Sequence, residues 1–481
     1  MLSKKINSVC QLGGEISMEP NIENAYLLLT SVGCMTDFDV IVLGGGGAGY
    51  TSAFELSRGG MKVLMLEPKG VLGGNCLYEG CVPSKTYWYG AHTVEMSSRV
   101  PFMEAEVSFP KLVNWKDEVQ RKRFAQHDQE IREHEGLTFI PESGFMIDSN
   151  HVKVNDNVYT TKYVVVATGA EPVVPQGYED GVTTHELLMP DTKIRQPPRR
   201  LAIIGGGYIG VEMSSVFSRL GSEVTLFAAH LLKEVSAEVQ GLLERELGRA
   251  GVKIAKERST GVKVESKGKV VVTEKGRWEG FDEVLVAVGR KPNTSSTAGI
   301  PLGKRGEIET TPGMRSPMEN VYAPGDVNGK FMLFHVAVLE GWVTAQNIME
   351  GNREVVEMDY NAVPFAVYTL PQVAWVGLWK DQAVAKGFDV ETRRYDLSLD
   401  SRAQIDGFAE GWMEIVVERG SQRILGAQVI GEDADMLIGE LALAVGERLT
   451  TYDLARLSQP HPTQLEQITS LMRRALKVNT D

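Results

Sequence analysis

Cysteine is scarce in this sequence, with four residues among 481. So few thiols exclude a small secreted fold that many disulfides hold together. Basic tracts are missing too, and the formal net charge of −13 disfavours a nucleic-acid partner, whose phosphates attract positive charge. No apolar run approaches the ~20 residues of a membrane span. Since no export signal is recognisable either, we expect a cytoplasmic protein without a nucleic-acid or membrane partner.

The composition is otherwise that of a globular protein, and the length requires several domains. Hydrophobic residues make up 43% and charged residues 23% of the chain, which are ordinary values. A chain of 481 residues exceeds what one hydrophobic core organises. The first apolar strand-like run follows Met35 and Asp37. Residues 1–35 therefore read as an N-terminal extension, or as the product of an upstream start codon.

A glycine fingerprint occurs twice, each time between an apolar strand and a helix. The first copy is GGGGAG at residues 44–49, and the second is GGGYIG at residues 205–210. At the same distance after each copy a second apolar strand follows, at residues 63–66 and 224–227, which completes a βαβ unit. In such a unit the first glycine makes the turn, the second admits a pyrophosphate, and the third packs helix on strand. The repeat predicts two Rossmann-like dinucleotide-binding domains.

The residue after the second strand distinguishes the two nucleotides. In the first copy it is Glu67, whose carboxylate can hold both ribose hydroxyls, and this favours FAD. Ala228 takes the same place in the second copy, so the acid that favours NAD is missing. His230 or Lys233 could reach the 2′-phosphate of NADP, although such side chains are also ordinary solvated surface residues. We therefore expect FAD at the first site and leave NAD or NADP open at the second.

Two cysteines, Cys76 and Cys81, lie five residues apart in the run NCLYEGCVPSK at residues 75–85. Positions i and i+5 do not share a helical face, so joining them requires a distorted turn, for which Gly80 has the freedom. Pro83 suits the first turn of a helix. Cys81 would then lie near a helix N-terminus, where the dipole favours a thiolate. The pair reads either as a redox disulfide or as two free core cysteines.

A histidine and a glutamate near the C-terminus form a second candidate pair. Pro462 biases His461 away from the helical region and can open the following helix as its first residue. Glu466 would then fall about one turn into the helix and could turn back to His461. A carboxylate that stabilises imidazolium makes histidine a competent acid–base near neutral pH. The alternative is a surface or capping histidine.

The remaining pattern places further strands around these motifs. Strand-like runs at residues 164–169 and 284–290 would close the two nucleotide domains. Alternation within residues 252–285 predicts a small antiparallel insertion. Residues 321–326 predict a short strand that ends in an acid, which could reach the ribityl or pyrophosphate part of a flavin. From about residue 358 onward no fingerprint occurs, and mixed strands and helices predict a separate α+β domain.

These motifs resemble the flavoprotein disulfide reductases, the class I pyridine nucleotide-disulfide oxidoreductase family, over roughly residues 36–475. Members include dihydrolipoamide dehydrogenase, glutathione reductase and mercuric reductase. The resemblance implies an α/β fold of the glutathione-reductase kind, with two Rossmann-like dinucleotide-binding domains and a C-terminal α+β dimerisation domain. The most specific segments are residues 75–85, 321–326, 368–374 and 461–466. The implied parts are an N-terminal extension (1–35), an FAD-binding domain (36–170), a NAD(P)-binding domain (171–290), an FAD or central domain (291–357) and an interface domain (358–481).

The resemblance also implies roles for single residues. Cys81 would face the flavin as a thiolate, and Cys76 would exchange with substrate. Lys85 and Glu212 would pair beside the flavin N5 edge, although an ordinary structural ion pair is an equal alternative. The His–Glu pair would come from the partner subunit, so that a homodimer shares its active sites.

The implied site residues fall into three groups, and none is assigned to a metal. The catalytic group is Cys76, Cys81, His461, Glu466, Lys85 and Glu212. The FAD group is Gly44, Gly46, Gly49, Glu67, Gly74, Thr168, Gly169 and Asp326. The nicotinamide-nucleotide group is Gly205, Gly207, Gly210, Gly289 and Arg290. The chain departs from the family pattern where Gln372 replaces a usual glutamate, where Asn75 replaces a common threonine, and at Ala228.

The motifs are most similar to those of dihydrolipoamide dehydrogenase. We therefore expect an FAD-dependent dithiol–disulfide oxidoreductase that acts on dihydrolipoamide, free or on a lipoyl domain, with NAD or NADP as electron partner. One alternative is a NAD(P)H-dependent reductase of another small disulfide, of the glutathione-reductase kind. A mercuric-reductase-like enzyme is disfavoured because residues 472–481 contain no cysteine. A non-catalytic flavoprotein sensor is disfavoured because the cysteine pair and the His–Glu pair occur together.

Overall fold

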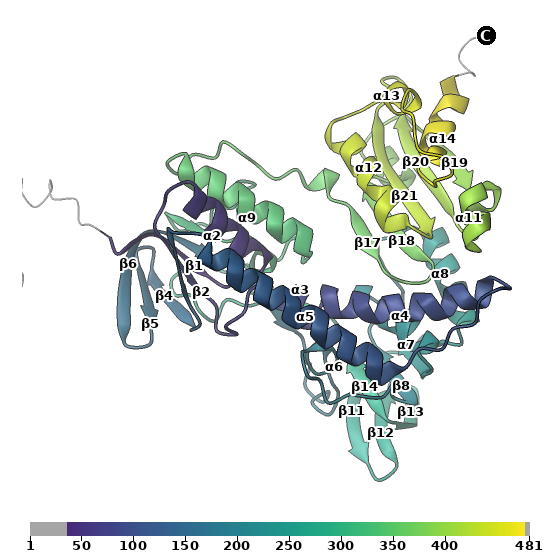
Figure 1. Cartoon of the computed structure of the whole chain (residues 1–481), viewed down its shortest axis with the longest axis horizontal. Coiled ribbons are helices and arrows are strands. Elements are labelled where there is room, and N and C mark those ends of the chain that lie inside the picture. The colour runs from purple at the N-terminus through teal and green to yellow at the C-terminus, as the bar shows by residue number, and fades with distance from the viewer. Residues whose placement is uncertain (1–35, 477–481) are drawn as a thin grey trace, which may run out of the picture. The chain divides into compact units, whose positions relative to one another are not determined.

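The computed structural model describes residues 36–476. Chain contacts separate Met1–Asp37 from a compact unit of Phe38–Asp481, to which all elements below belong (Figure 1). The expected N-terminal extension lies outside the described residues. Between residues 36 and 476, none of the helices combines the length and the hydropathy of a bilayer span.

The first glycine fingerprint lies at the edge of a seven-stranded sheet in the order β3–β2–β1–β6–β5–β4, with β16 also paired to β6. Strand β1 pairs in parallel with β2 and with β6, so the residues that follow these strands, Gly44, Glu67 and Ala167, meet at one edge. Open parallel sheets bind nucleotides at this edge. The strands are β1 (Phe38–Leu43), β2 (Val63–Leu66), β3 (Leu137–Ile140), β4 (Gly144–Asp148), β5 (His151–Val154), β6 (Asn157–Val166) and β16 (Val321–Tyr322).

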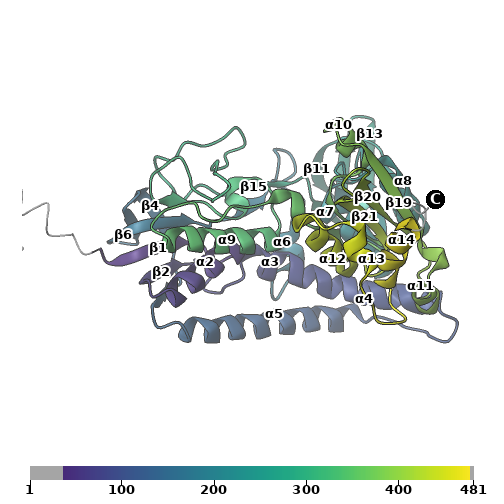
Figure 2. The ribbon, with the colours of Figure 1, turned by 90° about the horizontal axis from the view of Figure 1, so that it is seen from above.

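Two helices that are far apart in sequence pack together beside this sheet, as Figure 2 shows. Helix α2 (Gly47–Arg58) follows the fingerprint, and α9 (Phe334–Met349) packs along it. The contact is close because Gly341 has no side chain: a Cβ there would lie 2.4 Å from the Ala48 carbonyl oxygen. This packing brings the residues around the start of α9 next to the first fingerprint.

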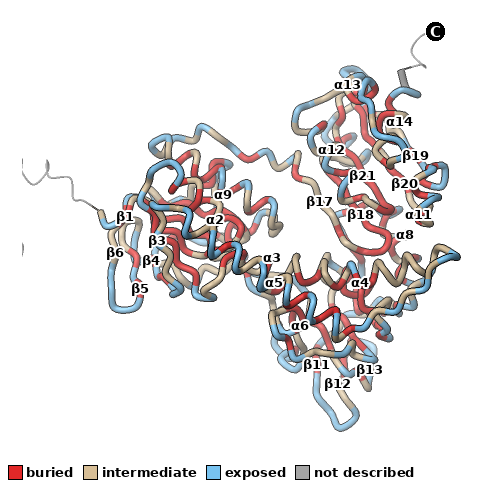
Figure 3. Tube along the Cα trace, viewed as in Figure 1, coloured by how far each residue is buried: buried red, intermediate tan, exposed pale blue. Residues whose placement is uncertain are grey.

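The second fingerprint lies in a four-stranded parallel sheet in the order β10–β9–β8–β14. Its strands β8, β9 and β14 are mostly buried, whereas exposed residues are frequent in the sheet β11–β12–β13, as Figure 3 shows. The repeat of strand, glycine turn, helix and strand is therefore confirmed. The elements are β8 (Arg200–Ile204), α7 (Tyr208–Arg219), β9 (Glu223–Phe227), α8 (Ala237–Arg249), β10 (Lys253–Ala255) and β14 (Glu283–Val286).

Two smaller sheets join these parts. The antiparallel insertion expected within residues 252–285 is confirmed as the sheet β11–β12–β13. Strands β7 and β15 pair antiparallel where the chain enters and leaves the second nucleotide unit. The strands are β7 (Ala170–Pro172), β11 (Ser259–Glu265), β12 (Gly268–Thr273), β13 (Gly276–Phe281) and β15 (Arg290–Pro292).

The C-terminal part is an α+β structure, as expected. Its five-stranded antiparallel sheet has the order β17–β18–β21–β20–β19, and helix α12 packs on β18 and β21. The strands are β17 (Phe365–Val367), β18 (Gln372–Gly377), β19 (Val390–Asp396), β20 (Trp412–Glu418) and β21 (Ile424–Gly431). The helices are α10 (Lys380–Ala385), α11 (Ser401–Asp406), α12 (Ala434–Gly446), α13 (Thr451–Ala455) and α14 (Glu466–Leu476).

The last helix begins later than the sequence pattern predicts. Pro462 does not open it, because α14 starts at Glu466. The residues before it form a turn in which the Thr463 amide donates to Glu466 Oε2 at 3.0 Å and the Thr463 hydroxyl donates to the Pro460 carbonyl at 2.8 Å. Glu466 is therefore the first helical residue rather than a residue one turn inside.

Four helices, α3 to α6, carry the cysteines or contact the helices that carry them. One residue, Gly80, separates helix α3 from helix α4, and α5 and α6 pack against α3. A six-residue helix such as α3 is not stable by itself, so its position depends on these neighbours. The bounds are α3 (Gly74–Glu79), α4 (Cys81–Arg99), α5 (Phe109–Arg132) and α6 (Thr184–Leu188).

A buried carboxylate holds the loop that ends in Asp326. Glu340 on α9 has no exposed surface, and its Oε2 accepts hydrogen bonds from the Gly325 amide at 2.5 Å and from Asn328 Nδ2 at 2.8 Å. Its Oε1 accepts the Tyr360 hydroxyl at 2.6 Å. Burial raises the pKa of Glu340.

Replacing Glu340 by glutamine should lower the free energy of unfolding by about 1–3 kcal/mol, because one amide oxygen cannot accept the hydrogen bonds of all three buried donors. Chemical denaturation of the flavin-free protein measures this. Glu350→Gln at the exposed end of α9 breaks only a surface pair with Arg353 and serves as the control. Equal stabilities for the two variants would show that Glu340 does not hold the loop.

Candidate active site

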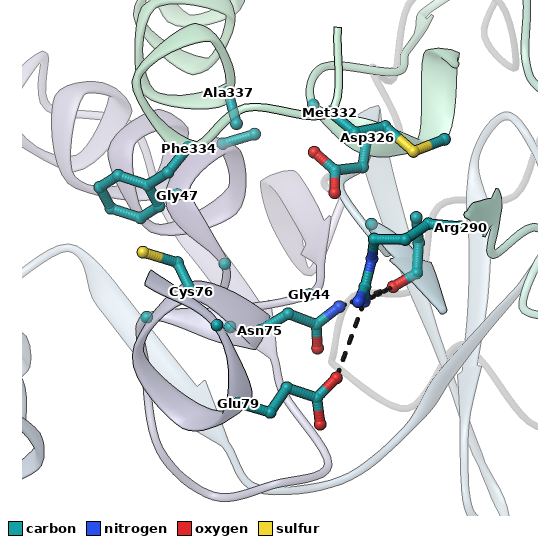
Figure 4. A pocket seen from close by; sticks show the side chains of 18 of the residues that line it. Gly44, Gly47, Asn75, Cys76, Glu79, Arg290, Asp326, Met332, Phe334 and Ala337 are labelled. Atoms are coloured by element: carbon teal, nitrogen blue, oxygen red, sulfur yellow. Dashed lines mark hydrogen bonds and ion pairs between the residues drawn. The ribbon is translucent and has the colours of Figure 1, made fainter. Parts of the chain in front are cut away.

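One cavity of about 800 Å³ brings most of the expected FAD and catalytic residues together (Figure 4). This volume lies within the range of cofactor sites. The cavity reaches from the first glycine turn past the cysteines to helix α7. Twelve of the residues assigned from the sequence line it: Gly44, Gly46, Glu67, Gly74, Cys76, Cys81, Lys85, Thr168, Gly169, Glu212, Arg290 and Asp326.

The three glycines of the first fingerprint have the geometry that a bound pyrophosphate requires. Gly44 has φ +102°, and a Cβ there would lie 2.3 Å from the Ala167 carbonyl oxygen. A Cβ on Gly49 would lie 1.9 Å from the Gly44 carbonyl oxygen, so helix and turn touch at this point. At Gly46 the nearest atom to such a Cβ is 3.8 Å away, which leaves room for a ligand over the helix N-terminus. The site therefore fits FAD phosphates.

The acid after β2 is held beside this turn. Glu67 Oε2 accepts a hydrogen bond from the Gly45 amide at 2.8 Å, and its Oε1 accepts one from the Lys69 amide at 2.9 Å. The side chain is almost fully buried yet lines the cavity. A carboxylate fixed in this way can accept the ribose hydroxyls of a dinucleotide.

Asp326 and Arg290 lie close together in the cavity (Figure 4). Burial raises the pKa of Asp326 to about 6, and the positive charge of Arg290 opposes this shift. Arg290 also donates to the Ala170 carbonyl at 2.7 Å. The structure thus places Arg290 in the cavity of the first glycine turn, and its expected contact with the nicotinamide nucleotide stays a prediction.

The two cysteines stand on either side of a helix break. Cys76 lies in α3 and Cys81 is the first residue of α4, with Gly80 between the helices. Both are free thiols in the structure, and their sulfurs hydrogen-bond to each other. This bond and burial raise the pKa of Cys76. The same bond lowers the pKa of Cys81, and Lys85 lowers it further against the effect of burial.

The expected ion pair forms next to the cysteines. Lys85 Nζ lies 2.9 Å from Glu212 Oε2 and 4.2 Å from the ring centre of Tyr368. Glu212 Oε1 accepts the Tyr368 amide at 2.9 Å, so the carboxylate joins α4, α7 and the segment before β18. Because one turn of α4 separates Lys85 from Cys81, the ammonium group stabilises a thiolate there.

The histidine–glutamate pair also forms, but not in the cavity. His461 Nδ1 lies 3.1 and 3.0 Å from the two carboxylate oxygens of Glu466. The His461 side chain is 76% exposed, and neither residue lines the cavity. In the part of the chain that the structure describes, His461 and Glu466 therefore do not reach the cysteines of the same chain. The hydrogen bond leaves Nε2 as the nitrogen that faces solvent.

The second fingerprint repeats the backbone of the first. Gly205 has φ +119°, and a Cβ on Gly210 would lie 1.8 Å from the Gly205 carbonyl oxygen. A Cβ on Gly207 would have no neighbour within 4 Å. The turn can therefore accept a second pyrophosphate.

The ribose end of this second site differs from the first. Ala228 is buried directly after β9, and the loop that follows folds back so that the Leu232 amide donates to the Gly206 carbonyl at 2.8 Å. No carboxylate takes the place that Glu67 has in the first copy. His230 and Lys233 are exposed in this loop.

Several cavity residues were not found by motif analysis. Glu79, Tyr208, His335 and Tyr368 line the cavity from α3, α7, α9 and the segment before β18. Tyr208 directly follows a fingerprint glycine, and this adjacency is a usable signal. Glu79 and Tyr368 lie in the segments 75–85 and 368–374, which the resemblance already marks, whereas His335 gives no sequence signal because only tertiary packing brings α9 to the cavity.

The thiolate of the reduced protein should depend on Cys81. Cys76→Ser keeps a hydroxyl donor toward Cys81, so a thiolate should persist at pH values below the ordinary cysteine pKa of about 8.5. Cys81→Ser should lose it, and Lys85→Met should raise the pKa of Cys81. Ultraviolet thiolate absorbance against pH measures all three. A low-pH thiolate that survives in Cys81→Ser and vanishes in Cys76→Ser would contradict these assignments.

Comparison with known proteins agrees with this geometry. The pyridine nucleotide-disulphide oxidoreductase family matches residues 38–341, and its dimerisation domain matches residues 363–472. The chain is 34% identical over 445 residues to a dihydrolipoyl dehydrogenase of Chlamydia trachomatis, which covers 89% of this chain and 95% of that protein. It is 33% identical over 483 residues to a mercuric reductase of Lysinibacillus sphaericus, over 96% of this chain and 86% of that protein.

A solved structure shows the same fold. LpdA from Mycobacterium tuberculosis superposes with a TM-score of 0.84 at 25% sequence identity, over 91% of this chain and 99% of that one. The fold is thus that of the glutathione-reductase-like flavoproteins, with a C-terminal dimerisation domain. The chain therefore belongs to the pyridine nucleotide-disulphide oxidoreductase family, whose enzymes depend on FAD and use NAD(P)H.

Proposed function

We propose that the protein oxidises dihydrolipoamide, passing two electrons through Cys76, Cys81 and FAD to a nicotinamide nucleotide. One observation carries this proposal: both cysteines and the Lys85–Glu212 pair line the same cavity as the first fingerprint. The similarity that spans 95% of a dihydrolipoyl dehydrogenase supports the choice of dithiol. Whether that dithiol is free or attached to a lipoyl domain does not change the chemistry at the cysteines.

The cysteines would exchange with the substrate in two steps. A substrate thiolate attacks Cys76 Sγ of the disulfide, the S–S bond breaks, and Cys81 leaves as a thiolate. The second substrate thiolate then attacks the mixed disulfide, which frees Cys76 and releases the substrate as a cyclic disulfide. Cys81 suits the leaving position because Lys85 and the N-terminus of α4 stabilise its negative charge. Bound FAD supplies the two-electron acceptor that restores the disulfide and the hydride donor for nicotinamide.

The His461–Glu466 pair would move the thiol protons. Glu466 holds Nδ1 and stabilises the imidazolium, so that Nε2 can take a proton from a substrate thiol. Because His461 is exposed and outside the cavity of its own chain, we assign it to the cysteines of the second protomer in a homodimer. The dimerisation domain of residues 363–472 contains the pair and supports this assignment.

Anaerobic mixing of the FAD-bound protein with dihydrolipoamide tests the substrate. We expect rapid bleaching of the flavin absorbance, and we expect Cys76→Ser to abolish it because the exchanging sulfur is gone. NADH or NADPH should still reduce the flavin of Cys76→Ser, which controls for a damaged site. A flavin that NADPH or NADH reduces but dihydrolipoamide leaves oxidised would contradict dihydrolipoamide as substrate.

The second nucleotide site should not discriminate for NADH. With Ala228 at this position, no carboxylate is available to accept a hydrogen bond from the free 2′-hydroxyl of NADH. The exposed side chains of His230 and Lys233, in the following loop, are hydrogen-bond donors that could contact a 2′-phosphate. We expect Ala228→Glu to shift the ratio of kcat/KM for NADH over NADPH by about tenfold toward NADH, the effect of one good hydrogen bond. Titration of the protein with NAD⁺ and NADP⁺ checks binding separately. A strong preference of the unmodified protein for NADH would contradict this reading of Ala228.

A further inference from the structure

A buried carboxylate lies between the two cysteines in sequence and does not take part in the exchange chemistry. Glu79 is the last residue of α3, three residues after Cys76 and two before Cys81. Its side chain is 6% exposed. A carboxylate removed from water to this degree is costly unless charged partners surround it. The partners of Glu79 therefore indicate what it does.

Those partners come from two other elements. Glu79 Oε2 lies 2.6 Å from His185 Nδ1 on α6, and its Oε1 lies 3.7 Å from the guanidinium of Arg290 on β15. Figure 4 shows the ion pair with Arg290, and Asp326 on the same side of the cavity. Arg290 is fixed in turn by the Ala170 carbonyl at 2.7 Å. Glu79 thus connects the end of α3, the helix of Cys76, to β15, the strand of Arg290.

Helix α5 holds the same end of α3 from another direction. Gln120, which has no exposed surface, donates through Nε2 to the Leu77 carbonyl at 3.0 Å and to the Tyr78 carbonyl at 2.8 Å. These are carbonyls of the last helical turn, which a helix of six residues cannot satisfy itself. The end of α3, and with it the break at Gly80, is therefore positioned by contacts from α5, α6 and β15.

We propose that Glu79 is a positioning residue that sets the stability of the Cys76–Cys81 disulfide by fixing the end of α3 against His185 and Arg290. This inference rests on the proposed function, because it concerns the same cysteine pair. The disulfide forms when the two thiols lose two electrons and two protons to an external disulfide. Its equilibrium constant depends on how well the dithiol form already holds the sulfurs at bonding distance. A looser helix end lowers this preorganisation and makes the disulfide easier to reduce.

The test equilibrates the FAD-bound protein with oxidised and reduced dithiothreitol and counts the cysteine thiols by alkylation and mass. For Glu79→Gln, which cannot pair with Arg290, we expect the equilibrium constant for disulfide formation to fall about tenfold, or about 30 mV. His185→Gln, at a side chain that is 44% exposed, should cause a smaller fall in the same direction. Asp191, just after α6, forms an exposed ion pair with Arg121. Asp191→Asn breaks this pair and should leave the equilibrium constant unchanged.

The outcomes separate positioning from general stability. If the equilibrium constant is unchanged in both Glu79→Gln and His185→Gln, the proposal is overturned. A lower melting temperature of Glu79→Gln in that case would show that Glu79 only stabilises the fold. A fall in the constant without loss of folded protein supports it. If the unmodified protein formed no Cys76–Cys81 disulfide at all, the proposed function itself would fail, and the two failures are thereby distinguishable.

Discussion

The proposed chemistry of this protein depends on one backbone break, at Gly80. A Cβ there would lie 2.9 Å from the Asn75 carbonyl oxygen, so only glycine lets the end of α3 fold back against its own first turn. The break allows two cysteines five residues apart to meet, which a continuous helix forbids. It also makes Cys81 the first residue of a 19-residue helix, where the dipole and Lys85 stabilise its negative charge.

The internal repeat explains why the cysteines meet the flavin site rather than the second nucleotide. Parallel strands place Gly44 and Glu67 at one sheet edge, and the chain passes directly from there into α3. Helices α4 and α7 then pack together, so that Glu212, which follows the second fingerprint, reaches Lys85. One cavity thereby contains the two cysteines and the first glycine turn, where we propose that thiol exchange and flavin binding take place.

Local sequence predicts those features that depend on short-range geometry. The two glycine turns, the helix start at Cys81 and the His461–Glu466 contact follow from spacing and backbone preference. Tertiary contacts explain what spacing does not predict. Arg290 follows the last strand of the second nucleotide domain, yet the pairing of β15 with β7 places its side chain in the cavity of the first glycine turn. The helix expected at Pro462 begins at Glu466, because that side chain caps the preceding turn.

We propose that the cysteine pair of one protomer and the His461–Glu466 pair of the other form one active site. The most direct test of this proposal combines two variants that are each expected to be inactive. Cys81→Ser and His461→Gln protomers, co-expressed with different tags, are purified as the mixed dimer. If each active site takes its cysteines from one protomer and His461 from the other, the mixed dimer contains one intact site. Its rate of dihydrolipoamide oxidation should then be near half that of the unmodified dimer. A mixed dimer as inactive as either parent would contradict a site built from both chains.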